Sequence, residues 1–152
     1  MSSSICGMLP FTHRRCAGER EAGLIGITAM RAATVSTWIE ESAASVRDQG
    51  DYLTQLDSAI GDGDHGINMN RGFEAVTKAL AGQDQSVPPG QLLVIAGKTL
   101  VATVGGASGP LYGTALRAAG RALGKADEFG GAELLAALEA SVAGVQDRKS
   151  VV

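Results

Sequence analysis

LLVIAGKTLVATVGGASGPLYGTALRAAGRAL, residues 92–123, is the stretch that decides the fold. Residues 92–104 form the most apolar segment of the chain and lack the alternation of a half-buried strand, so they predict a largely buried helix. The run GGASGP, residues 105–110, interrupts that segment, and residues 111–123 predict a second helix rich in Ala and Gly. Gly113 and Gly120 each cost about 1 kcal/mol relative to Ala within a helix, which indicates close helix contacts or the approach of a ligand.

The segments on either side of this stretch also carry apolar residues at helical spacing. They are Val35, Trp38, Ile39 and Val46 between Met30 and Gly50; Tyr52, Leu53, Leu56 and Ile60 in a short second helix; Met69, Phe73, Val76 and Leu80 in a helix that starts near Ile67; and Leu134, Leu138, Val142 and Val145. No segment shows sustained alternation with a period of two. We therefore predict an all-α fold, a bundle or barrel of antiparallel amphipathic helices.

The composition excludes several classes of protein. The chain has 152 residues, of which 45% are hydrophobic and 19% charged, and this balance is typical of a globular domain. The net charge of −3 offers no basic stripe for nucleic acid, and no apolar run approaches the roughly 18 residues of a membrane span. We expect residues 1–29 to be a poorly ordered extension rather than a secretory signal, and residues 30–152 to form the helical domain. A disulfide between Cys6 and Cys16 is conceivable, but a reduced cytoplasmic chain is the simpler interpretation.

An acidic loop, LDSAIGDGDHGIN at residues 56–68, is the first candidate site. Asp57, Asp62 and Asp64 fall within eight residues, and carboxylates at about 5 Å repel by roughly 3 kcal/mol per pair at an effective dielectric constant near 20. A cation would relieve that repulsion, and hard oxygen ligands select Mg²⁺ or Ca²⁺. The alternative is a solvated acidic turn at the positive end of the helix that starts near Ile67.

Three familiar motifs match this chain only superficially. GDGDHG, residues 61–66, fits the dinucleotide fingerprint GxGxxG, but a helical segment precedes it and its aspartates would repel unscreened phosphate. An EF-hand read from Asp62 would have Ile67 in place of Gly and Phe73 in place of Glu. Residues 97–99, Gly-Lys-Thr, resemble the end of a P-loop without its leading glycine.

The GGASGP turn is the second candidate site. Backbone N–H groups on a glycine turn ahead of a helix form an anion-binding concavity, and Ser108 adds a hydroxyl group. An ordinary interhelical loop is the alternative. His65, next to Asp64, could contact phosphate or ribose, or serve a structural role. A carboxylate loop and a glycine turn in one small helical domain together suit a nucleoside di- or triphosphate.

Two stretches in combination, LDSAIGDGDHGINMNRGF (residues 56–73) and TVGGASGPLYGTAL (residues 103–116), resemble the nucleotide-binding L-type subunit of dihydroxyacetone kinases. The same domain occurs at the C-terminus of single-chain dihydroxyacetone kinases, and the resemblance runs from about Val35 to Arg148. It implies a barrel of antiparallel amphipathic helices with the nucleotide at one end.

The resemblance also implies roles for individual residues. Asp57, Asp62 and Asp64 would ligate two Mg²⁺ ions that bridge the phosphates of ADP or ATP. The residues that would contact the nucleotide are His65, Gly66, Asn68, Gly106, Ala107 and Ser108. A partner subunit would hold dihydroxyacetone, so this chain needs no catalytic acid or base of its own.

Two routes of phosphoryl supply remain open from the resemblance. In one, ADP stays bound as a cofactor and a phosphohistidine protein of the phosphotransferase system recharges it; in the other, ATP exchanges as an ordinary substrate. An unfused chain of this kind favours the first route. The alternatives are a kinase domain for another small hydroxylated acceptor and a non-catalytic nucleotide-binding remnant.

The end of the sequence departs from the family pattern. Members continue with a glycine-rich loop that closes over the nucleotide and with further helices, whereas this sequence ends in GVQDRKSVV. From that difference we expect an incomplete barrel in which the faces of Leu134, Leu138 and Val142 are exposed. We also expect weak or absent kinase activity and a tendency to aggregate, because each large apolar side chain contributes about 1.5–3 kcal/mol when fully buried.

Overall fold

The structure, a computed structural model, describes residues 29–84 and 86–149. The two cysteines and nearly all of the expected N-terminal extension lie outside these residues. The described elements are β1 (Met30–Arg31), α1 (Ala32–Asp48), α2 (Gly50–Ser58), α3 (His65–Ala81), α4 (Pro89–Thr103), α5 (Ser108–Leu123), β2 (Glu128–Phe129) and α6 (Gly131–Lys149). The predicted all-α fold is therefore confirmed, apart from two strands of two residues each.

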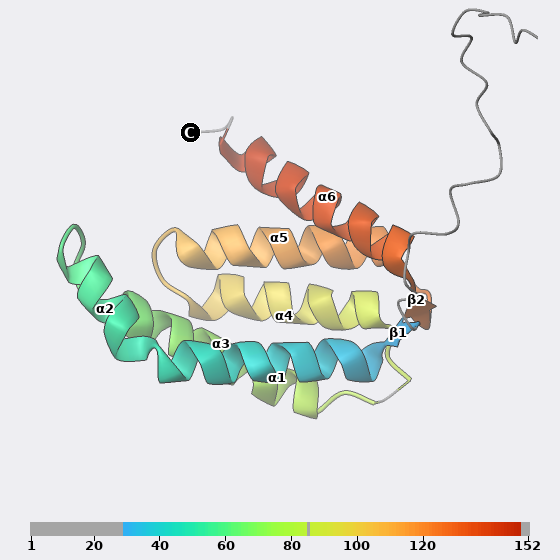
Figure 1. The fold of residues 1–152 in the computed structure, drawn as a ribbon, viewed down its shortest axis with the longest axis horizontal. Helices are drawn as coiled ribbons and strands as arrows, with labels where there is room; N and C mark the ends of the chain where they lie inside the picture. The colour runs from blue at the N-terminus through green and yellow to red at the C-terminus, as the bar shows by residue number, and fades with distance from the viewer. Residues whose placement is uncertain (1–28, 85, 150–152) are drawn as a thin grey trace, which may run out of the picture.

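The helices form an open row rather than a closed ring in the part of the chain that the structure describes. Figure 1 shows α6, α5, α4 and α1 in succession, and α3 packs against α1, α2 and α4. The turn between α4 and α5 and the loop after α2 lie at one end of the row, and β1 and β2 at the other (Figure 1). This arrangement brings the two candidate loops to the same end of the molecule.

The paired strands close the end opposite the candidate loops. Met30 pairs with Phe129 in an antiparallel register, so Met30 belongs to a strand rather than to the first turn of a helix. The guanidinium of Arg31 donates two hydrogen bonds to Glu128 Oε2, at 3.0 Å from Nε and 2.9 Å from Nη2. This ladder joins the start of α1 to the start of α6.

Close packing between α4 and α5 depends on glycine. A Cβ atom built on Gly97 would lie 2.6 Å from the carbonyl oxygen of Gly113, and one built on Gly113 would lie 2.5 Å from that of Gly97. The same reciprocal contact joins Gly90 and Gly120, near the ends of α4 and α5 that lie away from the turn between them. Gly113 and Gly120 therefore serve helix contacts, one of the two roles that the sequence left open.

The hydrophobic core lies where α1 and α3 meet α4. Ile39, Val76 and Leu100 are almost fully buried there. The predicted burial of α4 is confirmed, and the helix begins at Pro89, where proline suits the first helical position because it has no N–H to leave unpaired. This core fixes the ends of α3 and α4 relative to one another.

Two expected apolar faces are only partly buried. Trp38 is 51% exposed, although its neighbours Val35 and Ile39 are buried, and α2 has no buried residue at all. On α6, Ser141 Oγ donates to Ala115 O of α5 at 3.0 Å. Leu138 and Val142 are exposed, as expected from the sequence. The expectation for Leu134 is wrong, because this side chain is partly buried against the hydrophobic core.

Candidate metal and nucleotide site

The carboxylate of Asp57 organises the acidic loop. Asp57 lies in the last turn of α2, and its Oδ2 accepts hydrogen bonds from the backbone N–H groups of Gly63 at 2.9 Å, Asp64 at 3.1 Å and His65 at 3.4 Å. These N–H groups lead into α3, whose N-terminus attracts negative charge. Asp57 thus performs the capping role that the sequence left as an alternative to metal binding, and its Oδ1 does not take part in it.

Two glycines allow the loop to fold back onto Asp57. Gly63 has a φ of +73°, in the left-handed region that favours glycine, and a Cβ atom there would also lie 2.6 Å from Ser58 Oγ. A Cβ atom on Gly61 would collide with the carboxylate of Asp57 itself. The glycines of this loop therefore give the carboxylates room to gather.

The three carboxylates fit a divalent cation in number, chemistry and spacing. One ligand oxygen from each of Asp57, Asp62 and Asp64 lies within 4.8 Å of the others. Oxygens bound to one octahedral Mg²⁺ at about 2.1 Å lie about 3 Å apart at adjacent positions and about 4.2 Å apart at opposite ones, so the three side chains would move closer together to bind one ion. Asp57 is half-buried whereas Asp62 and Asp64 are exposed, which leaves their outer sides open to water and a further ligand.

The turn between α4 and α5 faces this loop. Gly106 has a φ of +63°, and α5 begins at Ser108 with Ala107 as the residue before its first turn. The N-terminus of α5 therefore points its unpaired N–H groups and partial positive charge outward from the turn. Ser108 Oγ lies 3.4 Å from His65 Nδ1, which links the start of α5 to the start of α3.

A hollow of about 570 Å³ lies between the loop and the turn. The residues that line it are Asp57, Asp62, Asp64, His65, Asn68, Arg71, Gly105, Gly106, Ala107 and Ser108. Eight of the nine residues predicted from the sequence are in this set. Gly105 adjoins the predicted turn, and Arg71 is the one charged residue that the sequence analysis did not single out, although its spacing of three from Asn68 puts both on one face of α3.

Gly66 is the predicted site residue that does not line the hollow. It is buried on the side of α3 that faces α2, where a Cβ atom would overlap the carbonyl group of Gly50 and approach Thr54 Oγ1. The structure therefore places Gly66 at a close contact between two helices.

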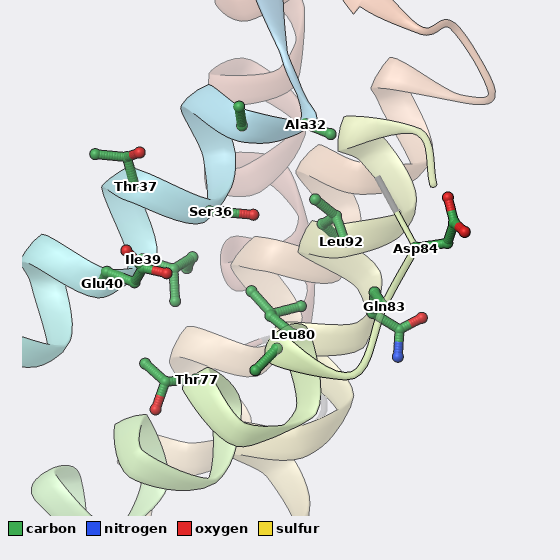
Figure 2. A pocket seen from close by; sticks show the side chains of 12 residues that line it. Ala32, Ser36, Thr37, Ile39, Glu40, Thr77, Leu80, Gln83, Asp84 and Leu92 are labelled. Atoms are coloured by element: carbon green, nitrogen blue, oxygen red, sulfur yellow. The ribbon is translucent and has the colours of Figure 1, made fainter. Parts of the chain in front are cut away.

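A second hollow, of about 320 Å³, lies among α1, α3 and α4 (Figure 2). Ser36 and Glu40 come from α1, Thr77 from α3, and Asp84 from the loop that follows α3. Figure 2 shows Glu40 and Asp84 on opposite sides of this hollow. Among the described residues, the carboxylates that gather closely enough to hold a metal ion are those of the acidic loop.

The family model for the DAK2 domain matches residues 59–152, which contain both the acidic loop from Ala59 onward and the glycine turn. The chain belongs to the DAK2 domain family. Within this DAK2 domain, Asp62, Asp64 and the GGASGP turn fall in the matched part, and Asp57 precedes it by two residues.

Named relatives of this DAK2 domain include kinase subunits and whole kinases. The chain is 39% identical over 111 residues to the ADP-binding subunit of PEP-dependent dihydroxyacetone kinase 1 of Listeria innocua, covering 73% of this chain and 55% of the relative. It is 46% identical over 81 residues to the corresponding subunit of Escherichia coli, covering 53% and 38%. A D-erythrulose kinase of Mycolicibacterium smegmatis is 36% identical over 91 residues, covering 59% and 16%. The chain thus spans only about half, or less, of the relatives' own length.

None of the described helices combines the length and the apolar character that crossing a bilayer demands.

Proposed function

We propose that this chain is the ADP- or ATP-binding subunit of a dihydroxyacetone kinase, which passes a phosphoryl group to dihydroxyacetone held by a partner subunit. The observation that carries this proposal is the pair of loops across one hollow: three carboxylates on one side and the N-terminus of α5 on the other. The first group suits Mg²⁺ and the second suits phosphate. The names of the Listeria and Escherichia relatives, both ADP-binding subunits, support ADP as the nucleotide.

In this proposal the side chains of Asp57, Asp62 and Asp64 hold two Mg²⁺ ions, which when bound neutralise negative charge on the phosphates. Asp57 has a second task, because its Oδ2 holds the loop while its Oδ1, which takes no part in those hydrogen bonds, would bind a metal ion. The backbone of Gly106 and Ala107 and the hydroxyl group of Ser108 bind phosphate oxygens.

His65 and Asn68 complete the proposed nucleotide contacts. Both lie in the first turn of α3 and line the hollow. Ser108 Oγ lies within 3.4 Å of His65 Nδ1 and so orients the ring. For Gly66 we propose a packing role instead of a nucleotide contact, because a side chain there would separate α3 from α2.

The proposed partners are a dihydroxyacetone-binding subunit and a phosphohistidine protein that recharges bound ADP. The PEP-dependent names of the two dihydroxyacetone kinase relatives favour recharging of ADP over exchange of ATP. Another small hydroxylated acceptor is the second candidate, supported by the D-erythrulose kinase relative.

Calorimetry with ADP tests the proposal directly. The wild-type chain should bind ADP saturably with Mg²⁺ present and much more weakly with EDTA. Asp62→Ala should reduce Mg²⁺-dependent affinity at least about a hundredfold, since it removes one charged ligand of the cation. Asp48→Ala is the matched control, because Asp48 is an exposed carboxylate at the end of α1 outside the hollow, and its affinity should equal that of the wild type.

Lack of Mg²⁺-dependent ADP binding by the wild-type chain would refute the proposal. If binding occurs, transfer assays with the other subunits supplied then separate the candidates. Phosphorylation of dihydroxyacetone favours the first, and phosphorylation of erythrulose alone favours the second. Binding without transfer to either acceptor indicates a non-catalytic nucleotide-binding protein.

A further inference from the structure

Arg71 is the cationic side chain of the hollow. It lies in α3, one turn after Asn68, and lines the same space as the three carboxylates and Ser108. Among the residues that the structure describes, no other lysine or arginine lines this hollow. The side chain is exposed toward it, so a bound ligand could reach the guanidinium.

Two hydrogen bonds fix the guanidinium of Arg71 in place. Nη2 donates to Asn68 Oδ1 at 2.6 Å, and Nε donates to the carbonyl oxygen of Thr103 at 3.3 Å. Thr103 ends α4 two residues before the glycine turn, so the arginine is held from both sides of the hollow. Holding a long side chain at two points removes much of the rotamer entropy that a ligand contact would otherwise cost.

Both partners of Arg71 are neutral, and its positive charge remains available. Asn68 contributes an amide oxygen and Thr103 a peptide oxygen, and among the described residues Arg71 is part of no salt bridge. A guanidinium has five N–H donors, of which these contacts use two. Three donors, including both on Nη1, remain for an anion, and their planar arrangement matches two oxygens of one phosphate group.

The charges around the hollow indicate which anion this is. The hollow combines three carboxylates that suit a cation with one guanidinium that suits an anion, and a phosphate group that binds the cation can contact both. We propose that Arg71 binds a phosphate group of the nucleotide, with Asn68 and Thr103 holding its guanidinium in position. This inference rests on the proposed function and assigns to that site a residue beyond the metal ligands and the glycine turn.

The test compares Arg71→Met and Arg71→Lys with the wild-type chain in two titrations. Calorimetry measures the Kd of Mg²⁺-ADP, and electron paramagnetic resonance measures the Kd of Mn²⁺ in the absence of nucleotide. Arg71→Met should raise the Kd of Mg²⁺-ADP about ten- to a hundredfold, because it removes hydrogen bonds to a charged group. Arg71→Lys should raise this Kd less, since lysine keeps the positive charge but lacks the planar set of N–H donors of a guanidinium. Arg47→Met, on the exposed surface of α1, is the matched control and should leave it unchanged.

Mn²⁺ binding distinguishes contact with phosphate from support of the fold. Removing a positive charge beside the carboxylates should leave the Kd of Mn²⁺ unchanged or lower it. A rise in the Kd of Mn²⁺ that parallels the rise for Mg²⁺-ADP would mean that Arg71 only holds the loops together, and would overturn the inference. Unchanged Mg²⁺-ADP affinity in Arg71→Met would also overturn it. If the wild-type chain itself binds no Mg²⁺-ADP, the proposed function fails. If the wild-type chain and Arg71→Met bind Mg²⁺-ADP equally well, only the inference about Arg71 fails.

Discussion

The two sides of the hollow are built by different kinds of interaction. On one side, α4 and α5 meet through reciprocal glycine contacts at Gly97 and Gly113, and seven residues of α4 are buried. On the other side, α2 buries no residue, and the acidic loop is held by hydrogen bonds to one carboxylate, Asp57. Few buried apolar contacts mean a lower free energy of local opening. The side with the glycine turn is therefore the rigid one, and the side with the acidic loop is the one that a bound cation would order.

The largest effect is expected where the rigid side depends on glycine. Gly113→Ala places a Cβ atom 2.5 Å from the carbonyl oxygen of Gly97, in a contact where neither helix backbone can yield alone. We expect a loss of about 2–3 kcal/mol in the free energy of unfolding, measured by urea denaturation, because overpacking outweighs the gain in helix propensity.

Gly50→Ala is the matched control for that substitution. A Cβ atom on Gly50 would meet no atom within 4 Å, and the residue opens α2 on the weakly packed side. It should raise the free energy of unfolding by up to about 1 kcal/mol through helix propensity alone. If the two substitutions shift stability by equal amounts, the contrast between the two sides is wrong.

The next effect concerns the carboxylate that holds the acidic loop. Asp57→Ala removes the acceptor of three backbone N–H groups, and we expect a loss of about 1–2 kcal/mol in unfolding free energy without any metal, as for other helix caps. Asp62→Ala removes a carboxylate for which the described structure shows no hydrogen bond, and without metal it should change stability by less than about 0.5 kcal/mol.

Added Mg²⁺ sharpens the comparison of these two carboxylates. Both alanine variants should lose any stabilisation by the cation, because each lacks one of the three ligands. Thermal denaturation with Mg²⁺ and with EDTA measures this directly. An Asp57→Ala chain that is as stable as Asp62→Ala in EDTA would show that the hydrogen bonds of Asp57 do not organise the loop.

Much of this arrangement can be predicted from the sequence because its signals are local. The acidic loop and the GGASGP turn are short runs whose residue types indicate a cation site and an anion site. The spacing and density of apolar residues predict the helices α3 and α4. Gly113 and Gly120 also indicate a close approach, although the sequence does not identify the glycines of α4 that they contact. The two loops can be predicted because residues close together in sequence supply most of their chemistry.

Other features depend on contacts between distant residues and leave no local signal. Arg71 belongs to the hollow because Thr103, in another helix, accepts its hydrogen bond. The pairing of Met30 with Phe129 involves strands too short to show alternation. Trp38 fits the apolar period of α1, yet only the placement of the other helices decides that it is half-exposed. Gly66 stands within a site motif but packs against α2, which its position in sequence does not reveal.

A smaller effect than that of Asp57→Ala is expected at the glycine turn between α4 and α5. Gly106 has a φ of +63°, but a Cβ atom there would meet nothing within 4 Å, so Gly106→Ala suffers only from the left-handed backbone. We expect a loss of about 1 kcal/mol in unfolding free energy, and a smaller loss for Gly106→Asn, because asparagine tolerates this conformation better. Urea denaturation of the two variants checks the order. Equal losses would point to a cause other than backbone strain, and a loss as large as that of Gly113→Ala would mean that the turn, rather than the contact between α4 and α5, sets the rigidity of this side.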